Sequence, residues 1–106
     1  FVIFAAIIKG EITLLATGSL SNPLGAYELD TNFFSNLKQI VLMGGIQKPL
    51  IINGKLLDGP NFSCDPEASL KVLSSVCSVT VMTGHICLQA FFEKTELISK
   101  GFTTGF

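Results

Sequence analysis

Three short apolar runs divide the chain, and each is followed by a glycine. A run of this length that ends at glycine is typical of a strand buried on both faces in a parallel sheet. Thr17, Met43 and Thr83 are the last residues of the three runs, so they should lie together at the carboxyl edge of that sheet. The predicted strands cover 11–17, 39–43 and 78–83.

Helix signals alternate with these runs. Asn22 is placed to cap a helix that has Pro23 at its first position, and Asp65-Pro66 is a stronger start of the same kind. Gly10 is placed to end a buried helix that precedes it. Alternating strands and helices imply right-handed crossovers, and hence an α/β fold with a mainly parallel sheet and helices on both faces. The predicted helices cover 1–9, 22–29, 33–38, 66–75 and 86–92.

The segment between the second strand and the Asp65 helix follows no periodic pattern. Residues 46–64 contain two prolines and two glycines, and they exceed the usual connection of about four to six residues. We expect a long ordered loop of the kind that commonly contributes to a binding site. Asn53-Gly54 within it is a turn signal in its own right.

Composition suggests that part of the surface is covered by another segment or chain. The 106 residues are 48% hydrophobic and 14% charged, whereas an ordinary soluble domain has roughly 25% charged residues. The apolar runs are nevertheless far shorter than the ~20 residues that a membrane span needs. We therefore expect a chain without a membrane-spanning segment that forms one small domain.

Charge and cysteine usage exclude further classes. The formal net charge is −1, and the charged residues form no basic stripe that would neutralise phosphates, so nucleic acid is not an expected partner. Cys64, Cys77 and Cys87 match neither a metal knuckle nor an even disulfide framework. With no secretory signal in view, we expect reduced thiols in a cytoplasmic protein.

Four motifs follow one another in a fixed order. The chain reads ITLLATGSLSN at 12–22, IVLMGG at 40–45, one loop asparagine at 53 and NFSCDPEAS at 61–69. This series resembles the inosine-uridine-preferring nucleoside hydrolases, which read ITLLATGPLTN, IVVMGG, a loop asparagine, then EFN and, after three residues, DPEAA. The resemblance covers about residues 8–92. It implies a doubly wound α/β fold and an enzyme that splits nucleosides into base and ribose.

The resemblance also implies roles for four residues. Thr17 matches a residue whose backbone carbonyl binds calcium, an ion that prefers oxygen ligands. Asn53 and Asn61 match two asparagines that hydrogen-bond the ribose, which suits an amide because it both donates and accepts. Met43 matches a methionine close to the sugar. The plainer alternatives are a strand end for Thr17, turns for the asparagines and core packing for Met43.

Three departures from the family pattern limit what the chain can do. The glutamate that precedes the second asparagine by two residues in the family is Gly59 here, and the adjacent Asp58 could replace it only if the loop shifts. The family's DTDxxxDD segment, which supplies the base and two calcium ligands, has no counterpart. A later aspartate ligand is also missing. One carbonyl cannot hold calcium, which takes about 6–8 oxygens, so we assign no catalytic residue and expect no calcium bound by this chain alone.

Two functional hypotheses remain. In the first, residues 1–106 are one partial α/β domain, an internal segment of a ribonucleoside hydrolase, and this segment is inactive alone. The intact enzyme would bind calcium, take a nucleoside as its substrate and act in purine salvage. In the second, the chain is a non-catalytic interaction or assembly module derived from a truncated hydrolase. Unpaired strand edges should make either form a homo-oligomer.

His85 and Cys87 suggest a nucleophilic pair only superficially. The two residues are two positions apart at the start of a predicted helix, where their side chains point in different directions. The sequence does not indicate which base the enzyme would prefer or how long the parent protein is.

Overall fold

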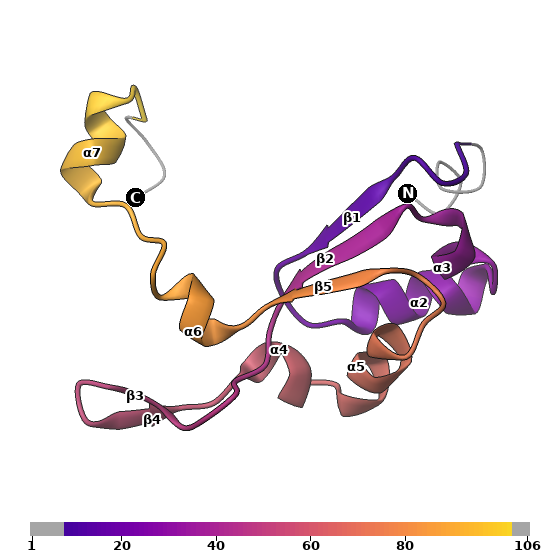
Figure 1. The fold of residues 1–106 in the computed structure, drawn as a ribbon, viewed down its shortest axis with the longest axis horizontal. Helices are drawn as coiled ribbons and strands as arrows, with labels where there is room; N and C mark the ends of the chain where they lie inside the picture. The colour runs from indigo at the N-terminus through magenta and orange to yellow at the C-terminus, as the bar shows by residue number, and fades with distance from the viewer. Residues whose placement is uncertain (1–7, 103–106) are drawn as a thin grey trace.

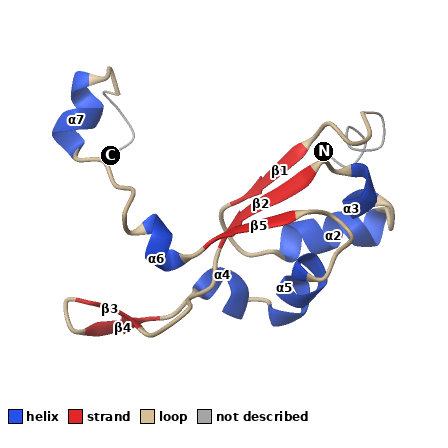
Figure 2. Cartoon of the chain, in the orientation of Figure 1, coloured by secondary structure: helices blue, strands red, loops and turns tan. Residues whose placement is uncertain are grey.

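A three-stranded parallel sheet forms the centre of the molecule. The structure, a computed structural model, describes residues 8–102. Strands β1 (Thr13–Ala16), β2 (Gln39–Met43) and β5 (Val79–Met82) lie in the order β1-β2-β5, all parallel (Figures 1 and 2). The α/β class, the parallel sheet and all three predicted strands are therefore confirmed. The predicted helix over 1–9 falls almost wholly outside the described residues.

Helices cover one face of this sheet. Helices α2 (Ser21–Leu29), α3 (Phe33–Asn36) and α5 (Pro66–Leu73) pack against the strand residues Ile40 and Leu42, both of which are fully buried. The core cluster that joins the helices to the sheet consists of Ala16, Leu20, Phe33, Phe34, Leu37, Ile40, Leu42, Ala68 and Val72.

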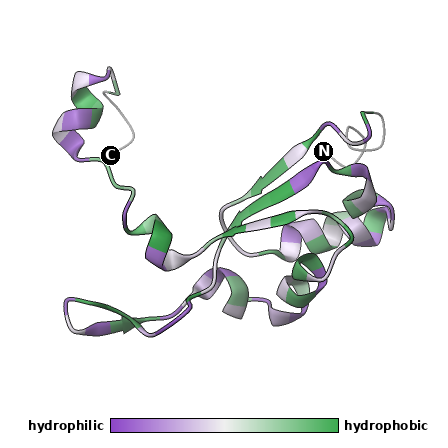
Figure 3. Cartoon of the chain, in the orientation of Figure 1, coloured by the Kyte–Doolittle hydropathy of each residue, from purple (hydrophilic) through white to green (hydrophobic). Residues whose placement is uncertain are grey.

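The other face of the sheet is open among residues 8–102. Leu15 on β1 is 67% exposed and Met82 on β5 is 38% exposed, and no described helix packs over them. The prediction of helices on both faces is thus met on one face only in this part of the chain. Because the strands are apolar at nearly every position (Figure 3), their sequence could not reveal which face is covered here.

The helix starts follow two different rules. Asp65 caps α5 as predicted, since its carboxylate accepts a hydrogen bond of 3.0 Å from the backbone N–H of Ala68. The Asn22 cap is wrong, because α2 begins at Ser21 and its N-cap residue Leu20 makes no side-chain capping bond. Leu20 is fully buried, so packing rather than capping sets the start of α2.

The segment 46–64 is not the patternless loop that the sequence suggested. It contains an antiparallel hairpin of β3 (Leu50–Ile52) and β4 (Lys55–Leu57), followed by the one-turn helix α4 (Pro60–Ser63). Asn53 and Gly54 form the hairpin turn with φ angles of 51° and 74°, which is the backbone that Asn-Gly turns favour. These two strands show no alternation of polar and apolar residues, because aliphatic side chains occupy both faces of each one, so the sequence did not predict them.

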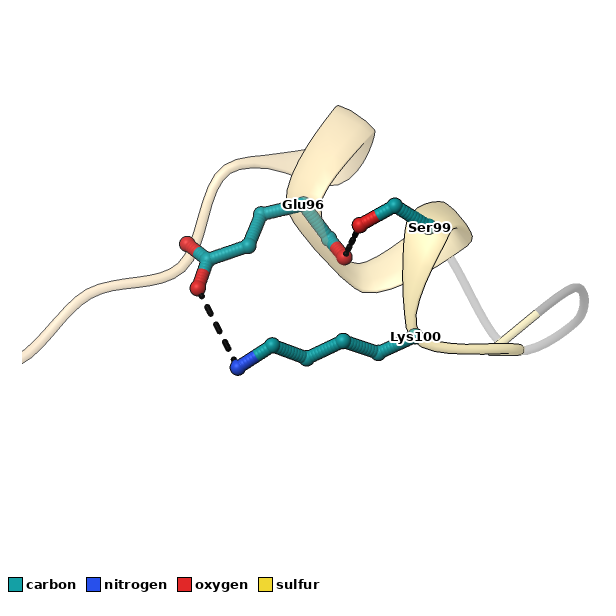
Figure 4. A network of polar contacts seen from close by, with 3 residues as sticks. All are labelled: Glu96, Ser99 and Lys100. Atoms are coloured by element: carbon teal, nitrogen blue, oxygen red, sulfur yellow. Dashed lines mark hydrogen bonds and ion pairs between the residues drawn. The ribbon is translucent and has the colours of Figure 1, made fainter.

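Two short helices follow β5. Helix α6 (Gly84–Cys87) ends earlier than the predicted 86–92 helix, and α7 (Lys94–Ser99) was not predicted. Contacts within α7 are local: Lys100 Nζ lies 3.3 Å from Glu96 Oε1, and the Ser99 hydroxyl donates to the Glu96 carbonyl at 2.7 Å (Figure 4). No helix within residues 8–102 combines the length and apolar character that crossing a membrane requires.

Candidate functional site

The side chain of Asn61 joins the carboxyl ends of two strands. Its amide nitrogen Nδ2 donates to the carbonyl oxygen of Thr17 at 3.2 Å and to that of Met43 at 2.9 Å. The same nitrogen lies 3.1 Å from the Met43 sulfur. Three of the four residues singled out from the sequence therefore meet at one point, although 44 and 18 positions separate Asn61 from the two carbonyls along the chain.

Each of the three residues is brought there by a different element. Thr17 follows directly after β1, and Met43 is the last residue of β2, so parallel pairing places both at the carboxyl edge of the sheet. Asn61 lies in α4, which returns to this edge after the hairpin (Figure 1). The Asn61 amide oxygen has no partner among the described residues, which leaves it able to accept a hydrogen bond from a hydroxyl.

An apolar cavity of about 260 Å³ adjoins this cluster. Met43 and Asn61 line it, together with the base of the hairpin and the start of α6. Among the described residues that line it, Asp58 alone is charged. This aliphatic lining was not predicted from the sequence. Its sequence signal is the pair of segments LII and KLL, which flank the Asn-Gly turn and pair as strands. The lining residues from these elements are Leu50, Leu57, Gly84, Cys87 and Leu88.

Asn53 is not brought to the cluster. It occupies the turn of the β3–β4 hairpin, is exposed, and does not line the cavity that Met43 and Asn61 share. The hairpin projects from the sheet with its turn at the far end (Figure 1). In this conformation the turn geometry accounts for Asn53 without a ligand.

Asp65 has a structural task close to the cluster. The Ala68 backbone N–H and, to a smaller extent, the Ser21 hydroxyl stabilise its carboxylate and hold the pKa of Asp65 below its usual 3.8. The backbone carbonyl of Asp65 accepts from the Ser69 hydroxyl at 2.9 Å. Asp65 therefore fixes the beginning of α5 and, through it, the position of the preceding α4.

The described residues do not form a complete metal site. Within residues 8–102 no three carboxylate, imidazole or thiol side chains come together to hold an ion. The Thr17 carbonyl, which already accepts from Asn61, is one oxygen where calcium takes about 6–8. Calcium therefore does not fit this set of residues by itself.

His85 and Cys87 do not form a pair. The Cys87 thiol is directed at the Met82 carbonyl, at 3.9 Å, whereas both ring nitrogens of His85 are buried and have no partner among the described residues. A histidine that is to act as a base must contact the nucleophile. In this conformation the Cys87 thiol and the His85 ring do not hydrogen-bond to each other.

Known proteins resemble this chain in sequence and in fold. The family described as inosine-uridine preferring nucleoside hydrolase matches residues 2–104. The chain is 34% identical over 96 residues to uridine nucleosidase 1 from Arabidopsis thaliana, and the match covers 91% of this chain and 28% of that protein. This chain thus spans well under half of the length of that relative.

The fold agrees with the motifs. A crystal structure of an inosine-uridine preferring nucleoside hydrolase from Bacillus anthracis matches with a TM-score of 0.69 at 21% identity, over 87% of this chain and 32% of that one. At this identity the structural match supports the fold alone. The family assignment rests on the sequence match, which extends over nearly the whole chain. From the parallel sheet, the motifs at its carboxyl edge and these matches together, the chain belongs to the inosine-uridine preferring nucleoside hydrolase family.

Proposed function

We propose that this chain supplies part of the ribose-binding wall of a ribonucleoside hydrolase, an enzyme that cleaves the bond between base and ribose. The single observation that carries the proposal is the Asn61 amide, which bridges the Thr17 and Met43 carbonyls and leaves its oxygen as an acceptor. A ribose is recognised through its hydroxyl groups, and an oriented amide oxygen can select them by accepting a hydrogen bond. Met43 offers the sugar ring an apolar contact beside that amide.

In this proposal the chain binds the sugar, and the residues that activate water for the cleavage lie outside it. Asn61 and Met43 bind and orient the sugar, and the Thr17 carbonyl contributes one oxygen toward a calcium ion. When bound, such an ion would polarise water for attack on the sugar. The remaining ligands and the base must come from other residues. Residues 1–106 would then be one partial α/β domain rather than a self-sufficient enzyme.

Asn53 remains within the proposal as a conditional second ribose contact. It can reach the Asn61 cluster only if the hairpin moves toward the sheet. Asp58 already lines the cavity beside Met43 and Asn61, and a local shift of its loop would be needed for it to take over from the carboxylate that Gly59 replaces. Both positions thus depend on a rearrangement, while Asn61 and Met43 are already together.

We propose a cytoplasmic location for this enzyme, because the three cysteines are free thiols of the kind that a reducing compartment maintains. The proposed role in nucleoside and purine salvage rests on the proposed nucleoside substrate. The proposed partner is a nucleoside. A second copy of the chain is the other proposed partner, since within residues 8–102 the sheet has an exposed apolar face and unpaired edges at β1 and β5.

A ribose titration followed by NMR tests the proposal on the chain itself. We expect ribose and uridine to shift the side-chain signals of Asn61 and the methyl signal of Met43. Asn61→Ala should abolish these shifts, and Asn32→Ala, which changes an exposed asparagine at the start of α3, should leave them intact. Shifts that spread over the open sheet face and survive Asn61→Ala would refute the ribose assignment.

An activity assay tests the division of labour. We expect the purified chain to release no ribose from inosine or uridine, with or without calcium, because the metal ligands and base are absent from it. Release above the protein-free blank that a chelator abolishes would show that the chain carries its own catalytic set.

A further inference from the structure

The ring of Phe62 lies directly over the backbone of Gly44 and Gly45. A Cβ atom added to Gly44 would stand 2.7 Å from Cδ1 and 2.9 Å from Cζ of that ring, and one added to Gly45 would stand 3.0 Å from Cε2. Distances below 3.0 Å do not occur for real Cβ atoms. The aromatic ring can occupy this place only because Gly44 lacks a side chain, and it also lies close over the backbone of Gly45.

Space, and not backbone conformation, requires glycine at position 44. Gly45 has a φ of 72°, which by itself favours glycine, but Gly44 is not among the residues with positive φ. Alanine could therefore adopt the backbone of Gly44 without strain. The three atoms nearest to a Cβ placed there all belong to the Phe62 ring, so this ring accounts for the demand for glycine at position 44.

The ring contact and the Asn61 hydrogen bonds lie one residue apart on both segments. Asn61 bonds to Met43, and the next residue, Phe62, packs on the next residue, Gly44. The carbonyl of Phe62 also accepts from the buried Ser69 hydroxyl at 3.0 Å, which ties it to α5. Two adjacent contacts of different kinds thus attach α4 to the end of β2.

We infer that Phe62 is a positioning residue for Asn61. Its ring, packed on the Gly44-Gly45 backbone, holds α4 at the distance where the Asn61 amide reaches both strand carbonyls. An amide on a one-turn helix without this contact would exchange its protein partners for water at little cost. The inference rests on the proposed function only for what Asn61 then binds.

The test uses NMR of the Asn61 side-chain amide in the 106-residue chain. Slow hydrogen exchange and through-hydrogen-bond couplings to the Thr17 and Met43 carbonyl carbons report the bridge directly. We expect Gly44→Ala to remove the couplings and to speed exchange at least tenfold. Gly18→Ala is the matched control, because a Cβ there meets nothing within 4 Å and Gly18 has no positive φ; it should behave as the parent chain.

Substitutions at Phe62 complete the test if Gly44→Ala does not fold. Phe62→Ala should remove the couplings, whereas Phe62→Leu, which retains an apolar contact, should restore part of the protection. Gly44→Ala should have a smaller effect in the Phe62→Ala background, because the clashing ring is gone. Unchanged couplings and exchange in folded Gly44→Ala or Phe62→Ala would overturn the inference.

The ribose titration distinguishes the two proposals. Loss of the amide couplings in the variants, with no ribose effect on the parent chain, would refute the ribose assignment and support the positioning role. Ribose shifts at Asn61 that persist in Phe62→Ala, with couplings intact, would support the ribose assignment and refute the positioning role.

Discussion

Two regions of this chain are built in different ways. The packed layer, formed by β1, β2, β5, α2, α3 and α5, has a core in which Ile40 and Val72 are fully buried. The projecting segments, formed by the β3–β4 hairpin, α6 and α7, expose much of their apolar surface, with Ile51 64% and Ile98 48% exposed. The first region joins residues distant in sequence, and the second is held mainly by local contacts such as the pairing of Ile52 with Lys55.

The difference explains which candidate residues meet. Thr17 and Met43 belong to strand ends of the packed layer, and Asn61 is attached to them where the chain returns from the hairpin. Asn53 lies at the turn of a projecting segment. A site built on packed elements is held in one geometry, because each side chain that forms it is supported by neighbours from several elements.

The largest expected effect contrasts a core residue with a hairpin residue. Phe33 is 1% exposed and Ile51 is 64% exposed. Phe33→Ala should lower the free energy of unfolding by about 3–5 kcal/mol, and Ile51→Ala should change it by about 0.5 kcal/mol or less. Urea denaturation measures both. Equal losses would mean that the hairpin contributes to the stability of the whole molecule, and the contrast between the regions would fail.

A change in the hairpin turn should remain local. Gly54 has a φ of 74°, and an alanine held in this left-handed region costs about 1–2 kcal/mol. Gly54→Ala should speed hydrogen exchange at the Ile52 and Lys55 amides without altering exchange in the packed layer. Gly18→Ala serves as the control. A matching loss of protection throughout β2 would contradict the separation of the two regions.

The cap of α5 should give the packed layer a dependence on pH. Hydrogen bonds from the Ala68 N–H and the Ser21 hydroxyl lower the pKa of Asp65 below 3.8. The ionised carboxylate therefore stabilises the folded state above the unfolded-state pKa, and this contribution is lost as the pH falls through the folded-state pKa.

Asp65→Ala should accordingly melt at a lower temperature than the parent chain at pH 7, and the gap should narrow in acid. Asp65→Asn keeps an oxygen that can cap the helix, so it should retain much of the stability while losing this pH dependence. Thermal melts at several pH values measure both effects. A gap that widens in acid would contradict the assigned direction of the shift.

The smallest expected change in stability comes from the open sheet face. Leu15 is 67% exposed on β1, which lies at the edge of the described sheet, so Leu15→Lys should alter the free energy of unfolding by about 0.5 kcal/mol or less. A charge on an edge strand opposes pairing between copies. We therefore expect the parent chain to form dimers or larger assemblies by light scattering and the variant to dissociate. A parent chain that is monomeric at high concentration would refute the proposed self-association.

Local patterns predicted much of the packed layer. The run QIVLM predicts β2 at the residues where the structure has it, 39–43, because its short length and the glycines that follow favour a buried strand over a helix. Asp65-Pro66 predicts the start of α5 because a cap needs only neighbouring backbone groups. Local rules failed at α2, where a buried leucine and not an asparagine precedes the helix, since tertiary packing outweighs the gain from a cap.

By itself the sequence determined where the strands lie, that they run parallel, and that Thr17 and Met43 share the carboxyl edge, because these properties depend on local periodicity and on the handedness of crossovers. Only the tertiary structure decided that Asn61 uses its amide nitrogen on both carbonyls, that Phe62 requires Gly44, and that Asn53 stays apart on the hairpin. Such contacts join residues far apart in sequence. They depend on how separate elements pack in space, and a one-dimensional pattern carries no record of that packing.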